Sequence, residues 1–265
     1  MLKKIVLDAG HGKGLAGHQT PDGIDEWTLN HKVALAVAKQ LAAYEVEISR
    51  VDDTTGKTDV SPMERLSKTN KIMPDAFISI HHHVYTGKWD THTGIEVYYN
   101  PSRENDDEKA LANEIAANIA TYTGLKNRGT KRTTYTVLTV DTNILALLTR
   151  GGFMDSTVDH PVITSEKGQE AYARGISDAL IKHLKLTKKC NDHQDKDASI
   201  AKVKIGNAYT LGTHLPGFHT ATDAKAGRNQ QVTVLAGTYT ISSLSEGMIN
   251  LTKMNEQPGV WINPN

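Results

Sequence analysis

Along the first 184 residues, short apolar runs alternate with longer stretches in which apolar side chains recur every three or four positions. The short runs predict buried strands, and the recurring pattern predicts helices. Strands are expected at 5–7, 46–51, 76–80 and 94–99, with a further apolar run at 144–148. Helices are expected at 25–44, 106–123 and 165–184. This alternation predicts an α/β fold with a mostly parallel sheet flanked by helices on both faces.

Two helix boundaries are marked by specific residues. Ser61 followed by Pro62 and Glu64 predicts a helix start, because serine caps the first turn, proline fits the first helical position and glutamate reaches back. Gly124 marks the end of the helix over 106–123, where a left-handed backbone conformation favours glycine. Both signals support the helical assignment.

A change of pattern near residue 185 divides the chain. Residues 1–184 are expected to form the α/β domain, and the almost wholly polar stretch 185–200 is expected to be a linker. Over 201–265, short β-type runs are separated by glycines, which predicts a small all-β barrel or sandwich. Two unequal domains fit a chain of 265 residues.

Composition limits the class of protein further. Hydrophobic residues make up 38% of the chain, which supports a core without disulfides, and the single Cys190 cannot form an internal bridge. A formal net charge of zero argues against a nucleic-acid partner bound through a broad basic face. No run approaches the roughly 18–20 apolar residues of a membrane span, and the N-terminus lacks the apolar stretch of a signal peptide. We therefore expect a protein made in the cytoplasm without membrane insertion.

Three potential metal ligands occupy places where sites form in α/β sheets. His11 follows the first predicted strand, His81 follows the third, and Glu26 lies in the first turn of a predicted helix. Two histidines and one carboxylate near the carboxyl ends of strands form a known catalytic zinc set with an open fourth position. A histidine after a strand is more often a polar loop residue. The glycines beside His11 and the run of three histidines that His81 begins favour the metal interpretation.

Four short motifs and one single residue, Glu26, follow one another through the first domain. They are Asp8-Ala9-Gly10-His11-Gly12, Glu26, Ser79-Ile80-His81, Gly94-Ile95-Glu96-Val97-Tyr98-Tyr99 and Gly151-Gly152-Phe153-Met154-Asp155-Ser156. Together they resemble the amidase-3 family of peptidoglycan amidases over residues 3–184. The resemblance implies a zinc-dependent N-acetylmuramoyl-L-alanine amidase with His11, Glu26 and His81 as zinc ligands. An enzyme of this kind hydrolyses the amide between the lactyl group of N-acetylmuramic acid and L-alanine.

The sequence departs from the family pattern at two positions. The family commonly has His-x-Asn after the third strand, where this chain has His83 in place of the asparagine. The family places a glutamate general base where this chain has Arg150. A guanidinium does not deprotonate and so cannot supply proton transfer, which is worth about 10²–10⁴-fold. We therefore expect zinc binding with slow or no turnover. Glu96 is an alternative base, though its place in a strand motif favours a structural role.

The remaining candidates have mostly structural interpretations. Trp27 is expected in the core. Tyr85 and Trp89 lie in a polar loop after the third strand, where contact with substrate and simple surface exposure are equally expected. Asp155 is expected to cap or orient the loop after position 150. Nothing around Cys190 lowers the pKa of its thiol enough to predict a nucleophile.

The region over 201–265 resembles a bacterial SH3-like cell-wall-binding domain in its size, its glycine-separated strands and the closing Gly259-Val260-Trp261-Ile262-Asn263. An unrelated dimerisation module is the alternative. The whole layout is similar to a phage endolysin, made in the host cytoplasm and acting on the cell wall after release. Expected partners are bacterial peptidoglycan and a cell-wall polymer, bound by a monomer or small homo-oligomer. Two other hypotheses are a non-catalytic peptidoglycan-binding protein, which Arg150 favours, and another zinc hydrolase such as a peptidase.

Overall fold

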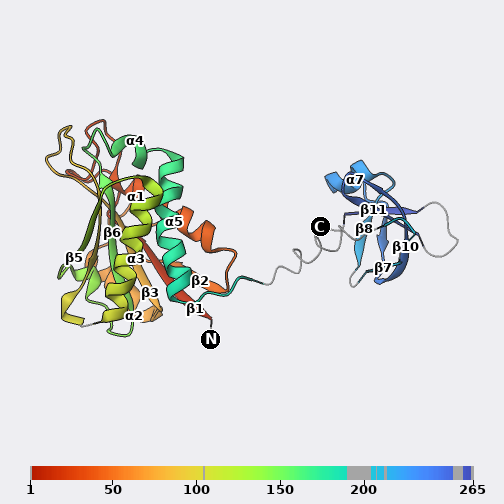
Figure 1. Cartoon of the computed structure of the whole chain (residues 1–265), viewed down its shortest axis with the longest axis horizontal. Coiled ribbons are helices and arrows are strands. Elements are labelled where there is room, and N and C mark those ends of the chain that lie inside the picture. The colour runs from red at the N-terminus through yellow and green to blue at the C-terminus, as the bar shows by residue number, and fades with distance from the viewer. Residues whose placement is uncertain are drawn as a thin grey trace. The chain divides into compact units, whose positions relative to one another are not determined.

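The computed structural model describes residues 2–103, 105–189, 204–206, 208–211, 214–252 and 259–263. The chain divides into two units, Met1–Lys189 and Cys190–Asn265 (Figure 1). None of the described helices combines the length and the apolar character that a membrane span requires.

A six-stranded sheet with the order β2-β1-β3-β6-β4-β5 forms the centre of the first unit. Its strands are β1 (Lys3–Ala9), β2 (Val46–Arg50), β3 (Ala76–His83), β4 (Ile95–Tyr99), β5 (Asn127–Arg132) and β6 (Leu145–Phe153). β1 is parallel to β2 and β3, and β6 is parallel to β3, whereas β4 is antiparallel to β6 and parallel to β5. The mostly parallel sheet expected from the sequence is confirmed, with β4 and β5 reversed.

Helices cover both faces of this sheet. They are α1 (Glu26–Leu41), α2 (Pro62–Ile72), α3 (Asp106–Thr123), α4 (His160–Ile163) and α5 (Glu166–His183), with the 3-10 turns η1 (Pro101–Arg103) and η2 (Thr136–Leu138). α1, α3 and α5 pack side by side on one face (Figure 1), and α2 with η2 covers the other. Along β1, Ile5 and Leu7 enter the larger core under the three helices, and Val6 enters the smaller core under α2. Successive strand residues point to opposite faces, so one strand serves both cores.

Both helix boundaries marked by the sequence are confirmed. The Ser61 side chain accepts a hydrogen bond from Glu64 N at 3.2 Å at the start of α2. Gly124 ends α3 in the left-handed conformation, with φ of 75°. The Glu64 carboxylate pairs with Lys68 at 2.9 Å instead of reaching back to the cap.

Three strands, β1, β3 and β6, are longer than their apolar runs predict, and one strand was not predicted. β3 continues through His81, His82 and His83, because its ladder with β6 resumes after an irregularity between His81 and His83. His81 therefore lies inside the strand, which corrects the expectation that it follows the strand. β5 was missed because its sequence, Asn-Arg-Gly-Thr-Lys-Arg, is polar throughout, as an edge strand can be.

The chain remains on the first unit for several residues beyond 184. Leu186 is buried and packs against the larger core. Glu45 N donates to Thr187 O at 2.8 Å, and Lys189 N donates to Ala43 O at 2.8 Å. Residues 185–189 of the expected linker thus belong to the first unit, and 190–200, including Cys190, lie outside the described residues.

The second unit is a small antiparallel β region. Its elements are β7 (Ala208–Leu211), β8 (Leu215–Gly217), α7 (Ala221–Ala226), β9 (Val232–Val234), β10 (Gly237–Ser245), β11 (Met248–Thr252) and β12 (Val260–Ile262). A sheet of order β12-β11-β10-β7 and a β8-β9 pair enclose a core that includes Tyr239, Ile241 and Leu251. The small β region expected after the first domain is confirmed, and the short helix α7 was not predicted.

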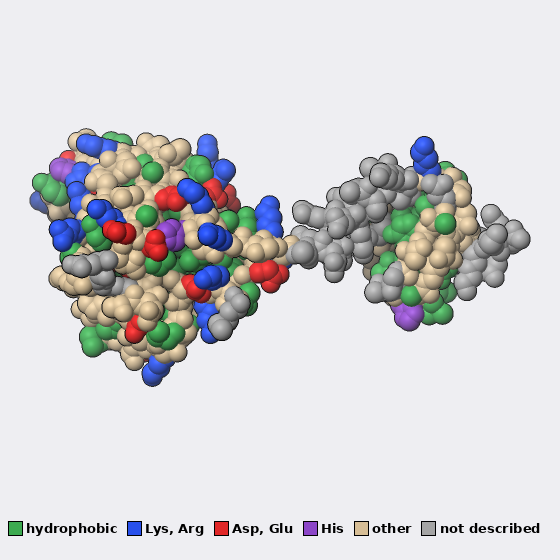
Figure 2. Space-filling model, turned by 60° about the horizontal axis from the view of Figure 1, so that its bottom comes forward, with side chains coloured by type: hydrophobic (Ala, Val, Ile, Leu, Met, Phe, Trp, Pro, Cys, Tyr) green, Lys and Arg blue, Asp and Glu red, His purple; other side chains and the backbone are tan. Residues whose placement is uncertain are grey.

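Charged side chains are mixed over the face of the first unit seen in Figure 2. Lys and Arg side chains alternate there with Asp and Glu side chains. On this face the described residues form no extended patch of one sign, in keeping with a formal net charge of zero.

Candidate metal centre

The end of β1 brings an imidazole against the backbone of the sheet. Gly10 N donates to Ile80 O at 3.0 Å and extends the pairing of β1 with β3. His11 follows with φ of 66°, a left-handed conformation that costs free energy in a residue with a side chain. A Cβ atom at Gly10 would lie 2.0 Å from Cε1 of His81, so glycine lets the His81 ring lie against this backbone. The rings of His11 and His81 meet edge to face, with centroids 4.9 Å apart.

Glu26 lies at the centre of the histidine cluster. It is the first residue of α1 and is 2% exposed, at a helix end that favours negative charge. Its Oε2 lies 3.0 Å from His18 Nδ1 and 3.4 Å from His11 Nε2. Its Oε1 lies 3.1 Å from His81 Nδ1. Three imidazole nitrogens therefore point at one buried carboxylate.

Neighbouring polar groups hold the Glu26 carboxylate in place. His82 N donates to Oε1 at 3.0 Å, and Asn30, one turn along α1, donates to the same oxygen at 3.3 Å. Asn30 also donates to Gly10 O at 3.1 Å, and its side-chain oxygen lies 2.8 Å from His82 Nδ1. α1, β1 and β3 are thus tied together around the carboxylate, which fixes its orientation as supporting bonds do in metal sites.

Burial and hydrogen bonding set the charge of the cluster. Burial lowers the pKa of His11 to about 3, against an opposing attraction from Glu26. Burial by itself would raise the pKa of Glu26, but hydrogen bonds from His18 and His81 hold that pKa well below its usual range. At pH 7 this gives an ionised carboxylate beside a neutral imidazole, the donor state that a divalent cation requires. Histidine nitrogens with one carboxylate oxygen fit zinc.

Two of the three predicted zinc ligands, His11 and Glu26, form a candidate metal-binding group with His18, whereas the third, His81, contacts Glu26 but is not part of that group. Ligand atoms of His11, His18 and Glu26 all lie within 4.8 Å of one another. Sequence reasoning missed His18 because it follows no strand. The sequence signal that could have identified His18 was its place in a glycine-rich loop leading to the start of α1. In the structure this loop returns to α1, and Glu26 N donates to His18 O at 2.8 Å.

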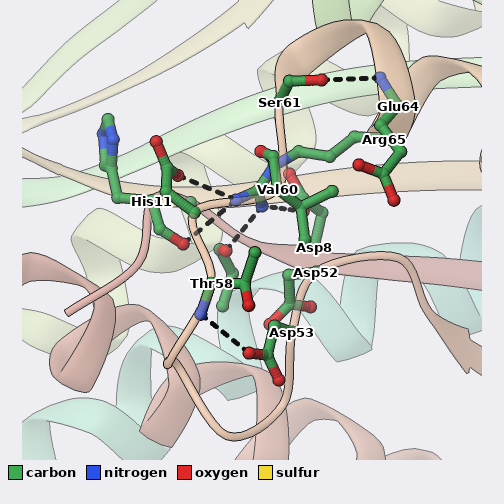
Figure 3. Close-up of polar contacts among 12 residues, drawn as sticks. Asp8, His11, Asp52, Asp53, Thr58, Val60, Ser61, Glu64 and Arg65 are labelled. Carbon is green, nitrogen blue, oxygen red and sulfur yellow. Dashed lines mark hydrogen bonds and ion pairs between the residues drawn. The ribbon is translucent and has the colours of Figure 1, made fainter.

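A buried ion pair supports His11 from the side of α2. The Arg65 side chain is 4% exposed and pairs with the Asp8 carboxylate of β1. The same guanidinium donates to Ala9 O at 2.8 Å and to His11 O at 3.0 Å (Figure 3). Ser79 donates to the other Asp8 oxygen at 2.7 Å. One cation therefore holds the backbone turn that presents the His11 ring.

The cluster opens into a pocket of about 580 Å³. Arg150 lines this pocket together with His11, His18, Glu26 and His81. Arg150 lies on β6, where its partner across the parallel ladder with β3 is His81. The position singled out as the family's base thus shares a pocket with the predicted zinc ligands.

Glu96, the alternative base, is already engaged. It lies opposite Arg150 in the ladder between β4 and β6 and is 6% exposed. Its carboxylate accepts hydrogen bonds from Arg128 Nε at 2.8 Å and from the Tyr98 hydroxyl, and His83 Nε2 lies 3.3 Å away. Burial would raise its pKa, but contacts with His83, Arg128 and Tyr98 lower the pKa overall. Because a carboxylate with a low pKa is a weak base, this arrangement argues for a structural role.

Asp155 orients the loop after β3. Its carboxylate accepts backbone N–H bonds from Tyr85, Thr86 and Gly87 at 2.8–3.1 Å. The expected role in the loop after position 150 is therefore corrected, because the carboxylate reaches across to the neighbouring strand end. Tyr85 and Trp89 of this loop are exposed, and neither is among the described residues that line the pocket. Trp27 is buried, as expected for a core residue.

The fold and the cluster define the class of protein. It is an α/β domain with a mostly parallel sheet and a candidate metal site at the carboxyl ends of β1 and β3. Residues 5–182 match the model of the Amidase_3 family, N-acetylmuramoyl-L-alanine amidase. The chain belongs to this family.

Individual relatives agree with the family match. The N-acetylmuramoyl-L-alanine amidase CwlM of Bacillus licheniformis is 28% identical over 206 residues, covering 77% of this chain and 75% of that protein. The sporulation-specific N-acetylmuramoyl-L-alanine amidase of Bacillus subtilis (strain 168) is 28% identical over 205 residues, with 77% and 75% coverage. Among solved structures, an N-acetylmuramoyl-L-alanine amidase from Clostridium difficile 630 has a TM-score of 0.63 at 26% identity, covering 69% of this chain and 97% of that chain.

Proposed function

We propose that the first unit hydrolyses the N-acetylmuramoyl–L-alanine amide bond of peptidoglycan, with zinc held by His11, Glu26 and His81. The observation that carries the proposal is the convergence of imidazole nitrogens within 3.4 Å of the buried Glu26 carboxylate. The substrate is supported by membership in the Amidase_3 family and by the two Bacillus relatives, which are N-acetylmuramoyl-L-alanine amidases.

The residues in and around the pocket are suited to holding the metal, but Arg150 is not suited to moving protons. Zinc in such a site supplies Lewis acidity, which polarises the scissile carbonyl and lowers the pKa of water to about 7. Asn30 and the His82 backbone keep Glu26 oriented, and Arg65 keeps the His11 turn in place. Arg150 stands where the family resemblance places a base, and its guanidinium neither accepts nor returns a proton at neutral pH. We therefore propose that this chain turns over slowly.

His81 rather than His18 is proposed as the second histidine ligand. The His81 side chain is 13% exposed and lies on a central strand, whereas the His18 side chain is 39% exposed and lies in a loop. A donor held by packing loses less freedom on binding, so it contributes more to affinity.

Removing these histidines one at a time is expected to affect zinc affinity unequally. His81→Ala should weaken zinc binding by more than the roughly 10–100-fold that changes outside the ligand shell cost. His18→Ala should weaken it by less than about tenfold. Competition with a chromophoric chelator measures both, and His219→Ala, an exposed histidine of the second unit, is the control. A larger loss in His18→Ala than in His81→Ala would reverse the ligand assignment.

Product analysis tests the reaction itself. Purified cell walls incubated with the zinc-loaded chain are expected to release new alanine amino termini slowly, and a chelator is expected to stop the release. End-group labelling measures which amino termini appear. Other termini would indicate a peptidase, and release that continues under excess chelator would contradict the zinc proposal.

A non-catalytic peptidoglycan-binding protein is the second candidate. The observation that favours this candidate is that the pocket has no carboxylate free to act as a base. Among the described residues that line the pocket, Glu26 is the only one with a carboxylate, and that carboxylate is surrounded by histidines. Under this candidate the chain binds walls at pH 7 and frees no amino termini. End-group labelling and co-sedimentation with walls, performed together, separate the two candidates.

The role proposed for the second unit is wall attachment. Its small antiparallel sheet and glycine-separated strands support an SH3-like wall-binding domain. Binding to a cell-wall polymer would raise the effective concentration of the first unit at its substrate. Together the two units support a phage endolysin, made in the host cytoplasm and acting after release. Co-sedimentation with walls and analytical ultracentrifugation distinguish wall attachment from dimerisation.

A further inference from the structure

Among the described residues of the first unit, Arg150 differs from the other buried or half-buried arginines in lacking an acidic partner. Arg65 pairs with Asp8, Arg50 pairs with Asp52, and Arg128 pairs with Glu96. Among the described residues, Arg150 forms no ion pair, although it lines the pocket. An arginine kept inside a pocket without a counter-ion has the capacity to take its anion from a ligand.

The surroundings of Arg150 hold its guanidinium in one place. Its Nη1 lies 3.2 Å from His83 Nδ1, and its central carbon lies 5.3 Å and 5.7 Å from the ring centroids of Tyr98 and Tyr135. Contacts of this kind between a cation and aromatic rings are attractive. Because a guanidinium has no acceptor, His83 Nδ1 must accept the bond, which leaves the His83 proton on Nε2, the atom that faces Glu96.

Most of the hydrogen-bonding capacity of Arg150 is unused. The guanidinium carries five N–H donors in a planar fork, and the described residues accept from Nη1 alone. Its Nε is buried and has no hydrogen-bond partner among the described residues. Glu96, across the ladder, is already engaged by Arg128 and Tyr98 and does not neutralise it.

We propose that Arg150 binds a free carboxylate of the peptidoglycan stem peptide and so makes the pocket selective for stems that are not amidated. This inference rests on the proposed function, because the proposed substrate is what identifies the ligand as a carboxylate of the stem peptide. Arg150 is the ladder partner of His81, so it lies one strand spacing, about 4.8 Å, from a proposed zinc ligand. The carboxyl group of L-alanine is consumed in the next peptide bond. The second stem residue is glutamate joined onward through its γ-carboxyl, so its α-carboxyl is the first free carboxylate beyond the scissile amide.

The difference between an acid and its amide at that residue is what a guanidinium distinguishes. A carboxylate accepts two parallel N–H bonds from the guanidinium fork. A primary amide offers one oxygen and presents N–H groups to a cation that only donates. Arg150 thus acts as a specificity-determining residue, in the place where the family resemblance puts the base.

A pair of matched probes tests the inference. The γ-methylamides of N-acetylmuramoyl-L-alanyl-D-glutamate and of N-acetylmuramoyl-L-alanyl-D-isoglutamine imitate the onward γ-peptide bond of the stem and differ only in the α-carboxyl group, which is free in the first and amidated in the second. Calorimetry with the full chain is expected to show roughly 10–100-fold tighter binding of the acid. Arg150→Gln should bring the two probes within about threefold of each other while leaving affinity for the amide nearly unchanged. Arg174→Gln, an exposed arginine on α5, is the control and should keep the preference.

The outcomes separate this inference from the proposed hydrolysis. Equal binding of the two probes by the wild-type chain would overturn it, as would a preference that survives in Arg150→Gln or a failure of both probes to bind. If walls release no alanine amino termini while the acid is still preferred, hydrolysis is lost as the function and the carboxylate site stands. Circular dichroism of each variant confirms that loss of preference is not loss of fold.

Discussion

Replacing Arg150 with glutamate is expected to raise the rate of amide hydrolysis by about 10²–10⁴-fold at pH 7. The change puts a carboxylate on β6 in the pocket, at the ladder partner of His81. A carboxylate there can take a proton from water and return it to the leaving amine, which a guanidinium cannot do. Glu96 lies opposite, but Arg128 already neutralises it, so its repulsion of the new carboxylate is limited.

Arg150→Gln is the matched control for that change. It removes the positive charge without supplying a base, so on walls whose stem peptides are amidated, and so offer Arg150 no carboxylate to bind, its rate should remain near that of the wild-type chain. The measurement is the initial rate of alanine amino-terminus release from purified walls, with zinc content determined for each variant. Equal rates for the wild-type chain and Arg150→Glu would place the proton shuttle elsewhere. A gain in Arg150→Gln as large as in Arg150→Glu would assign the defect to charge repulsion.

Breaking the buried Asp8–Arg65 pair is expected to give the largest loss of stability. Arg65→Met should lower the free energy of unfolding of the first unit by about 3–5 kcal/mol. The variant leaves the Asp8 side chain, which is 1% exposed, with the Ser79 hydroxyl as its remaining side-chain partner among the described residues. It also frees the His11 carbonyl from the guanidinium that holds the left-handed turn, so zinc affinity should fall as well.

An exposed arginine provides the comparison. Arg174 pairs with Asp178 at 3.4 Å on the surface of α5, where such pairs contribute roughly 0.2–1 kcal/mol, so Arg174→Met should be nearly neutral. Urea unfolding followed by circular dichroism measures both variants. A loss below about 1 kcal/mol in Arg65→Met would contradict the expected penalty for a buried unpaired charge. Adding Asp8→Asn to Arg65→Met should recover part of the loss, because it removes that charge.

The sequence by itself determined much of the local structure and two donors of the candidate metal site, His11 and Glu26. The cap at Ser61 and the glycine at Gly124 were readable because each acts within one helical turn. The alternation of apolar runs and helical patterns was enough for the α/β class, since burial on one face imposes its period on neighbouring residues. The family motifs then predicted His11, Glu26 and His81 as zinc ligands, and the structure places nitrogens of both histidines within 3.4 Å of the Glu26 carboxylate.

Only the tertiary structure decided which side chains meet across the sheet. Arg65 supports His11 and Asp8 from 54 and 57 residues away, and Glu96 is held by Arg128, 32 residues on. These pairings depend on the order and register of the strands, which capping and periodicity do not encode because those signals extend over a few residues. His18 lies against Glu26 because of the path of the loop before α1, which no local sequence pattern encodes. Among the described residues Arg150 likewise has no acidic partner, because its ladder partner Glu96 is paired with Arg128.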